Sequence, residues 1–396
     1  MSRTSAGSKH PVAAVLTPRG RGAIATIAVA GEPERLAEIP FRAVRGGGLE
    51  DLPVDRVAFG RWGHDVGEDV VVCRTGTQRF EIHCHGGPAA VERIVQDLRR
   101  CGVEAVEPFG FVRVTEGVVA AALAKAQAGA RSLWTATMVV RQRDVWRSTV
   151  DRWRERLQDG STQGATRARR RNPVATDEKW EQWRAEIAGI LHWSEWARHL
   201  TEPFEVVVTG PPNAGKSSLV NRLLGYQRAI VYDRPGTTRD VVTGETVLHG
   251  WPVRFSDTAG VRPTDDVLER EGIRRALAAA RRADLVLWLD DRTQPPVRLA
   301  DWKDVVAGAL VVDHKADQPR HPAWGHEEVA GVAVSSRTGE GIDALARRVV
   351  DRLVPAHPSA EQPLPLTREL TAWLRELDDA LQRHRAEQVA AVLREA

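Results

Sequence analysis

Short apolar runs and helical repeats alternate along the first part of the chain. Between residues 10 and 115, runs in which apolar and polar positions alternate predict strands, and a 3.6-residue repeat predicts an amphipathic helix. The predicted strands lie at residues 13–18, 22–31, 69–75 and 79–85, and the helix lies at 88–102. A mixture of strands and a helix in one segment predicts an α+β domain.

From about residue 116 to 200 the apolar spacing is helical throughout. Two helical faces are marked by Trp146, Val150, Trp153 and Leu157, and by Trp180, Trp183, Ile187 and Leu191. We interpret these tryptophans as packing residues rather than as base-stacking platforms, because they follow the helix repeat. The polar, glycine-containing segment 159–173 predicts a loop, whose basic end either contacts RNA phosphates or is a solvated linker.

Strands and helices alternate between residues 201 and 356, which predicts a mostly parallel sheet with crossover helices. The strands are predicted at 204–210, 251–257, 284–290, 308–314 and 331–336, and the helices at 217–225, 269–283 and 341–353. A proline-rich linker follows, and then a helix from about residue 367. We expect this last helix to pack on the helices before residue 200.

Composition favours a globular protein of a reducing compartment. The 396 residues are 42% hydrophobic, carry a formal net charge of +3 and include three cysteines, Cys73, Cys84 and Cys101, without paired spacing. No apolar run is long enough to cross a bilayer, and the N-terminus lacks the apolar core of a signal peptide. These features predict a cytoplasmic protein without a membrane partner.

Five short motifs follow one another in the region of alternating strands and helices. They are GPPNAGKSS (210–218), PGTTRD (235–240), DTAG (257–260), HKAD (314–317) and SSRTGEG (335–341). The first matches the phosphate-binding pattern GxxxxGK[ST], in which backbone N–H groups and a helix N-terminus surround phosphates. The order of the motifs predicts a P-loop GTPase domain that binds and hydrolyses GTP.

Each motif suggests a role at a Mg²⁺–nucleotide site. Lys216 is expected to bridge the β- and γ-phosphates, and Ser217 and Thr238 are expected to hold Mg²⁺. Asp257 is placed to hold Mg²⁺ directly or through water, and the N–H of Gly260 to sense the γ-phosphate.

The HKAD motif predicts guanine as the base. The Asp317 carboxylate can accept hydrogen bonds from guanine N1–H and from its exocyclic amine together. His314 stands where this motif normally has Asn, and an imidazole cannot reproduce the paired donor and acceptor of an amide. We therefore hypothesise that His314 weakens nucleotide affinity or loosens specificity.

Val261 follows DTAG where many small GTPases have a glutamine that orients the attacking water. An aliphatic side chain cannot orient water, so another group must do so. The nearest acidic residues are Asp265, Asp266 and Glu269, whose alternative interpretation is a solvated helix start.

With these motifs, and with TPRGRGAIA (17–25) and EIHCHGGP (81–88) in the N-terminal part, the chain resembles the MnmE/TrmE family of tRNA modification GTPases. The resemblance covers the N-terminal domain, part of the helical domain and the whole G domain. It implies an N-terminal α+β domain at 1–116 for folate binding and dimerisation, a helical domain at 117–200 and 357–396, and an inserted G domain at 201–356.

The resemblance also implies a K⁺-dependent hydrolysis. Asn213, Tyr232, Arg234 and Thr237 would surround K⁺, and Glu269 would orient the nucleophilic water through a second water. Together with the interpretation of the motifs, catalysis is assigned to Glu269, Lys216 and Asn213. The expected GTP contacts are Asn213, Ala214, Gly215, Lys216, Ser217, Ser218, Tyr232, Asp233, Arg234, Pro235, Gly236, Thr237, Thr238, Asp257, Thr258, Ala259, Gly260, His314, Lys315, Ala316, Asp317, Ser335, Ser336 and Arg337.

Further partners follow from the same resemblance: a second copy of the chain, tRNA, an MnmG-like FAD protein, and a tetrahydrofolate derivative near Glu81. Three positions depart from the family. An arginine of the family aligns with Ala28, a lysine falls near Ala120, and the C-terminal motif CIGK does not occur in a sequence that ends LREA. The leading hypothesis is a dimeric GTPase in tRNA wobble-uridine modification. The alternative is a regulatory GTPase without folate chemistry, and the N-terminal motifs disfavour an unrelated ribosome-assembly GTPase.

Overall fold

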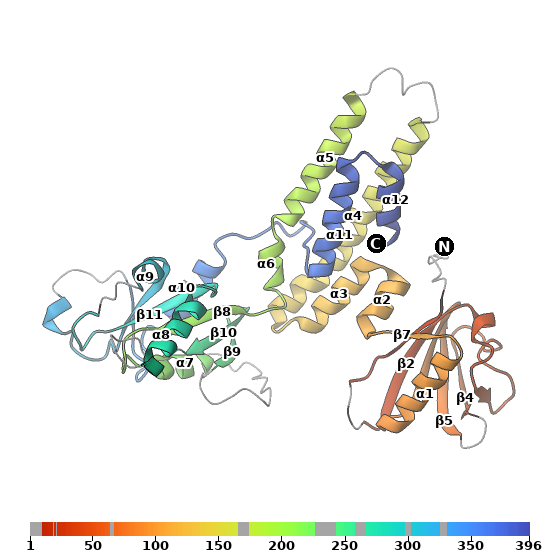
Figure 1. Ribbon diagram of the computed structural model, residues 1–396, viewed down its shortest axis with the longest axis horizontal. Coiled ribbons are helices and arrows are strands. Elements are labelled where there is room, and N and C mark those ends of the chain that lie inside the picture. Colours follow the sequence, from red (N-terminus) through yellow and green to blue (C-terminus); the bar gives the residue numbers. More distant parts are fainter. Residues whose placement is uncertain are drawn as a thin grey trace. The chain divides into compact units, whose positions relative to one another are not determined.

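The computed structural model describes residues 10–18, 20, 22–63, 67–164, 174–225, 243–257, 267–297, 302–324 and 331–396. Contacts within the chain divide it into two compact units. Unit 1 consists of residues 1–125, 146–187 and 368–396, and unit 2 of residues 126–145 and 188–367. Figure 1 shows the helices and strands of both units.

Unit 1 contains a seven-stranded sheet in the order β3-β4-β5-β6-β2-β1-β7. The strands are β1 (Val12–Val15), β2 (Ile24–Ala30), β3 (Phe41–Ala43), β4 (Arg56–Trp62), β5 (Glu68–Gly76), β6 (Arg79–His85) and β7 (Glu104–Ala105). All neighbouring pairs are antiparallel except β1 and β7. A short 3₁₀ helix, η1 (Pro33–Leu36), lies between β2 and β3.

One face of this sheet forms a core against α1 (Pro88–Arg100). Ile27, Val72 and Ile82 point to that face and are buried with Ile94 and Leu98 of the helix. Burial follows the strand alternation that the sequence predicts at 69–75 and 79–85.

The opposite face of the sheet is covered only in part. Helix α2 (Pro108–Glu116) packs Phe111 against small residues of β1 and β2, including Ala14 and Ala28. Beyond this cover lie two cross-strand rows that are half-buried or exposed. The rows are Val57, Cys73 and Glu81, and Phe59, Val71, His83 and Thr26. We call these seven residues the open face.

The rest of unit 1 consists of parts of long helices with a tryptophan core. In the chain, α3 (Val118–Gly129) comes first. Four helices that follow it lie side by side in Figure 1: α4 (Leu133–Gly164), α5 (Val174–Leu191), α11 (Arg368–Gln382) and α12 (Ala386–Arg394). The Trp153 ring centroid lies 6.3 Å from that of Trp146, 6.1 Å from that of Trp183 and 6.3 Å from that of Trp373. The packing role of the tryptophans and the return of the last segment onto the earlier helices are both confirmed.

The loop predicted at 159–173 begins too early, because α4 continues to Gly164. A helix that has already formed adds a residue at little cost, so its polar end extends beyond the last packed turn. Residues 165–173, which contain the basic cluster, lie outside the described residues.

Unit 2 contains a six-stranded sheet in the order β13-β12-β11-β8-β10-β9. Its strands are β8 (Phe204–Thr209), β9 (Thr243–Leu248), β10 (Trp251–Asp257), β11 (Leu285–Asp291), β12 (Leu310–His314) and β13 (Val332–Val334). Five strands are parallel, as predicted, and β9 pairs antiparallel to β10 at the edge.

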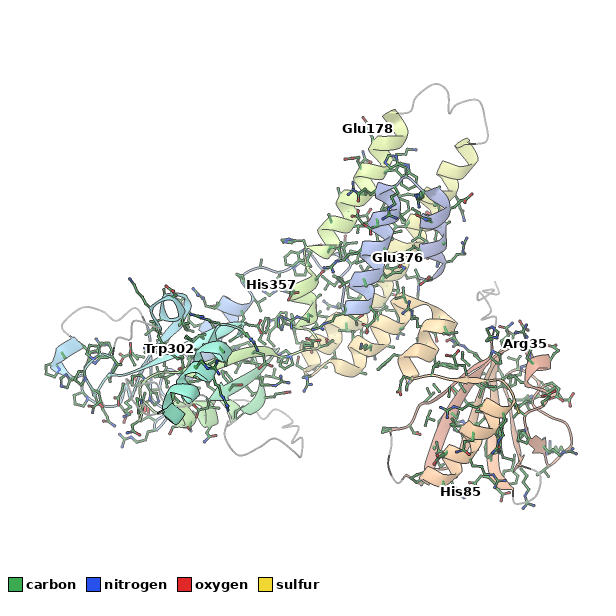
Figure 2. All side chains as sticks on the ribbon, viewed as in Figure 1. Arg35, His85, Glu178, Trp302, His357 and Glu376 are labelled. Carbon is green, nitrogen blue, oxygen red and sulfur yellow. The ribbon has the colours of Figure 1, made fainter. Side chains whose placement is uncertain are left out.

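Helices cover both faces of this sheet. Helices α7 (Lys216–Leu224) and α10 (Ile342–Leu353) contact each other and the sheet, while α8 (Val267–Ala280) and α9 (Lys303–Gly308) lie on the strands β8 and β11. All seven residues of β11 are buried, as expected of a central strand covered on both faces. Trp302, labelled in Figure 2, lies 6.0 Å from Trp288 of that strand between ring centroids.

The hairpin between β9 and β10 is anchored to helical segments of the same unit. At its turn, Gly250 accepts a hydrogen bond of 2.6 Å from the hydroxyl of Ser132. The ring of Trp251 lies 4.6 Å from that of Trp134 in α4, and 5.0 Å from that of Trp196 in α6 (Ser194–Arg198). Residues of the predicted helical region therefore hold one edge of the predicted G domain.

Several elements were not predicted from the sequence: β3, β4, β7, β9, α2, α9, α12 and the 3₁₀ helices η1 and η4 (Pro322–Trp324). Helix α9 ends where the strand at 308–314 was expected to begin, so β12 starts at Leu310. Within the described part of the chain, no helix combines the length and apolar character needed to span a bilayer.

Candidate guanine-nucleotide site

The parallel sheet of unit 2 brings four of the predicted motifs to one edge. The loop 210–215 follows β8, Asp257 ends β10, His314 ends β12, and Ser335 follows β13. Since parallel strands end at the same edge of a sheet, residues far apart in sequence converge there. In doubly wound sheets this edge is where ligands bind.

The loop 210–215 has a backbone shape that few side chains tolerate. Asn213 and Gly215 have positive φ values of 61° and 94°, and Gly215 directly precedes α7. A Cβ on Gly210 would overlap the carbonyl oxygen of Leu289 in β11. The glycines therefore let the loop pass close to the sheet and lead directly into the N-terminus of α7, an arrangement that suits phosphate oxygens.

Lys216 lies folded over this loop. Its Nζ donates hydrogen bonds to the carbonyl oxygens of Gly210 at 3.3 Å and Pro211 at 2.9 Å, and the residue is buried. Burial lowers the pKa of the ammonium, and the charge of Asp257 opposes that effect. Weak carbonyl partners and a desolvated charge leave this lysine ready to exchange them for phosphate oxygens.

Ser217 and Asp257 form an oxygen-rich pair beside the lysine. The Ser217 hydroxyl donates to Oδ2 of Asp257. Oδ1 of the same carboxylate is buried and has no hydrogen-bond partner among the described residues. A hydroxyl and an unsatisfied carboxylate oxygen are ligands that Mg²⁺ accepts, so the residues present fit the ion.

Asp317 is oriented by residues that follow β13. Its Oδ1 accepts a hydrogen bond of 2.6 Å from Ser335, and its Oδ2 lies 2.9 Å from Nε and 2.8 Å from Nη2 of Arg337. The hydrogen bond from Ser335, together with the charge of Arg337, holds the pKa of Asp317 below its ordinary value. The carboxylate is therefore ionised at neutral pH, as an acceptor for guanine N–H groups must be.

His314 connects three parts of the site. Its Nδ1 lies 2.6 Å from the carbonyl oxygen of Ala214, and its Nε2 lies 2.8 Å from Oγ of Ser336. The residue is 3% exposed, and burial lowers the pKa of the imidazole. The irregular residue of the HKAD motif thus ties the phosphate loop to the loop after β13.

Charged residues around this motif support it, and of these the sequence analysis named only Lys315. Lys315 donates to Oδ2 of Asp291 at 2.6 Å and to the Asn213 carbonyl at 3.2 Å. Arg292 and Arg320 both bond the buried carboxylate of Asp313, at 2.5 and 2.6 Å. Ion pairs between distant loops leave no pattern in a sequence, so this network could not be predicted. The one available signal was that Asp313 directly precedes the motif.

The remaining predicted contacts differ in how far the structure describes them. Asn213 in the loop 210–215 and Ser218 in the first turn of α7 are exposed, and Ala316 donates its N–H to the carbonyl oxygen of Val334. Glu269 lies in α8, but its side chain is outside the described set. Also outside are Tyr232, Asp233, Arg234, Pro235, Gly236, Thr237, Thr238, Thr258, Ala259 and Gly260.

Glu81, the predicted folate contact, lies on the open face in unit 1. Its Oε2 is 3.6 Å from Nε2 of His83. The neighbouring position across β2 is Ala28, which is buried against Phe111 of α2. The Glu81 carboxylate is thus present, but position 28, where the family has an arginine, carries no guanidinium.

Comparisons with known proteins match these observations. A family model described as "50S ribosome-binding GTPase" covers residues 205–315. The tRNA modification GTPase MnmE of a Thermus thermophilus strain is 32% identical over 87% of this chain and 83% of its own length. The MnmE proteins of Symbiobacterium thermophilum and Hyphomonas neptunium are 33% and 34% identical, over 92% and 73% of this chain and 87% and 68% of their own lengths.

Asp317→Asn is predicted to change the base that the site selects. The amide oxygen of Asn can accept a hydrogen bond from the base N1–H. Its NH₂ group faces the 2-amino group of guanine, where two donors meet, but it can donate to the C2 carbonyl of xanthine. Losing charge-assisted hydrogen bonds of about 1.5–3 kcal/mol each should weaken GTP binding by about 100-fold. Titration with GTP and XTP should show the preference reversed.

Asp313→Asn is the matched control for that experiment. This carboxylate is buried, forms ion pairs with Arg292 and Arg320, and directly precedes the motif without being assigned to the base. Its substitution should lower thermal stability while the preference for GTP over XTP is kept. A wild-type preference for GTP that survives in Asp317→Asn would contradict the assignment of Asp317.

Proposed function

This chain belongs to the MnmE family of tRNA modification GTPases, and from that membership we propose that it hydrolyses GTP as a step in the modification of tRNA wobble uridines. The supporting observation is the meeting of Lys216, the Ser217–Asp257 pair and Asp317 at one edge of the sheet. These groups match a triphosphate, its metal ion and a guanine base in turn. We further propose that the protein acts in the cytoplasm.

In this proposal the protein's own groups position the reactants. Lys216 and the N-terminus of α7 stabilise negative charge on the β- and γ-phosphates as water attacks the γ-phosphorus. Ser217 and Asp257, together with Thr238, would hold Mg²⁺, which would supply positive charge beside the phosphates. Glu269 orients the nucleophilic water, since Val261 cannot. The expected contacts in 232–238 and 258–260 complete the proposed site.

We also propose that K⁺ supplies the positive charge that other GTPases take from an arginine. Asn213 projects from the strained part of the phosphate loop, where it is exposed and has a φ of 61°. Its side-chain oxygen suits a monovalent cation next to the phosphates, with Tyr232, Arg234 and Thr237 as further ligands.

Hydrolysis is accordingly predicted to depend on K⁺. Replacing K⁺ by Na⁺ at equal ionic strength should lower kcat by about tenfold or more, since one stabilising charge is lost from the transition state. Asn213→Ala should lower kcat in K⁺ to the level seen in Na⁺. Ser218→Ala, at an exposed position in the first turn of α7, is the control that should keep the K⁺ effect. Equal rates in the two salts would remove the role proposed for Asn213.

A homodimer is proposed through the open face. Val57 and Phe59 are 66% and 55% exposed, and Val71 and Cys73 stand beside them on β5. An apolar surface on a sheet whose other face is already a core is costly to leave in water. A second copy would cover this surface and bring two Glu81 side chains close to one interface.

Phe59→Asp is predicted to dissociate that dimer. A carboxylate buried in an apolar interface is strongly destabilising, so sedimentation or light scattering should show a shift toward monomers. The matched control is Phe109→Asp, since Phe109 is 38% exposed on α2 and is not one of the open-face residues. A dimer that persists in Phe59→Asp, or that is lost equally in both variants, would contradict this interface.

Partners of the proposed reaction are tRNA and an FAD protein similar to MnmG. The fit of a tetrahydrofolate derivative is incomplete, because Ala28, where the family resemblance places an arginine, is packed under α2. We therefore derive no step through folate. This observation favours a second candidate function, a regulatory GTPase that has lost the folate-dependent chemistry.

Modification of tRNA separates the two candidates. The chain is expressed in a bacterial strain that lacks its own MnmE, and wobble uridines are analysed by mass spectrometry. Under the leading proposal, wild type restores the modified nucleoside and Lys216→Ala does not. If wild type hydrolyses GTP but restores nothing, the regulatory candidate is supported.

A further inference from the structure

Both ring nitrogens of His314 are used inside the protein. A carbonyl oxygen only accepts, so the short contact of Nδ1 with Ala214 requires a hydrogen on Nδ1. In the neutral ring, Nε2 is then an acceptor for the hydroxyl of Ser336. In the protonated ring, Nε2–H donates to the same hydroxyl oxygen. In either state, no ring N–H is left to meet a nucleotide.

The ring is also fixed in place. It is 3% exposed, and a Cβ on Gly215 would overlap its Cε1 atom, so the phosphate loop lies directly against it. Turning the ring over would set a C–H group against the Ala214 carbonyl and give up both hydrogen bonds. The next cation in the motif is engaged as well, because Lys315 bonds Asp291 and the Asn213 carbonyl.

Guanine offers two kinds of hydrogen-bonding edge. Its N1–H and 2-amino groups are donors, and its N7 is an acceptor on the other side of the base. Asp317 provides acceptors for the first edge. We propose, as a refinement of the guanine site above, that the 314–317 motif reads guanine by its N1–H and 2-amino groups alone, with no side-chain hydrogen bond to N7. His314 is then a positioning residue that holds the phosphate loop against Ser336.

Nucleotide analogues test this proposal in the full-length chain with Mg²⁺. 7-Deaza-GTP lacks only the N7 acceptor, and ITP lacks only the 2-amino group. Wild type should bind 7-deaza-GTP within about twofold of GTP, whereas ITP should bind about tenfold or more weakly, because a charged acceptor then loses its donor. A loss of tenfold or more with 7-deaza-GTP would overturn the proposal.

Two variants separate positioning from direct contact. Ser336→Ala removes one hydrogen bond to the ring, so GTP affinity should fall severalfold while the ratio of GTP to 7-deaza-GTP affinity stays near one. His314→Asn supplies two amide N–H groups, of which one can bond Ala214 and the other is available to N7. In that variant 7-deaza-GTP should bind severalfold more weakly than GTP. Equal binding of the two by a folded His314→Asn chain would contradict the role given to the ring.

Failure of the underlying site has a different signature. If ITP binds wild type as tightly as GTP, the reading of guanine by Asp317 is wrong, and this proposal falls with it. A loss confined to 7-deaza-GTP overturns the statement about N7 and leaves the GTP site intact.

Discussion

The parallel pairing of β8 with β10 on one side and β11 on the other is the constraint on which the nucleotide site depends. Register places Val208 beside both Asp257 and Leu287, and His314 beside both Asp291 and Val334. Each motif therefore begins at nearly the same height on the sheet. The loop 210–215, the Ser217–Asp257 pair and the Asp317 carboxylate therefore converge without any further device. The hydrogen bonds of His314 to Ala214 and Ser336 then hold the loop 210–215 against the loop that follows β13.

A second constraint links the site to the helical region. The hairpin of β9 and β10 lies between residues 226–242 and 258–266, which hold the predicted contacts Thr238 and Gly260. Its turn is bonded to Ser132, and Trp251 packs between Trp134 and Trp196. The strands that flank these predicted contacts are therefore held by Ser132 and by side chains from α4 and α6.

The sequence was most informative where a motif is local. The strand, loop and helix around Lys216, the alternation along β5 and β6, and the tryptophan repeat on α4 and α5 follow from spacing within one segment. The hydrogen bonds of His314 could not be predicted, because nothing in the sequence shows that the Ala214 carbonyl lies next to the His314 ring in the folded chain. The pairing of Asp313 with Arg292 and Arg320 has the same origin. Short elements were missed for a different reason. Helix α2 is only nine residues long, and the burial of its Phe111 depends on contacts with the sheet that the sequence does not show. The open face is likewise recognised only once β4, β5 and β6 are placed in register.

Phosphate release from GTP and from ATP by the full-length chain, in Mg²⁺ and K⁺, tests most directly that this sheet edge is a GTP-hydrolysing site. The arrangement of Lys216, Asp257 and Asp317 predicts hydrolysis of GTP to GDP and phosphate, little turnover of ATP, and loss of GTP turnover in Lys216→Ala. Equal hydrolysis of ATP and GTP, or turnover that survives in Lys216→Ala, would contradict it.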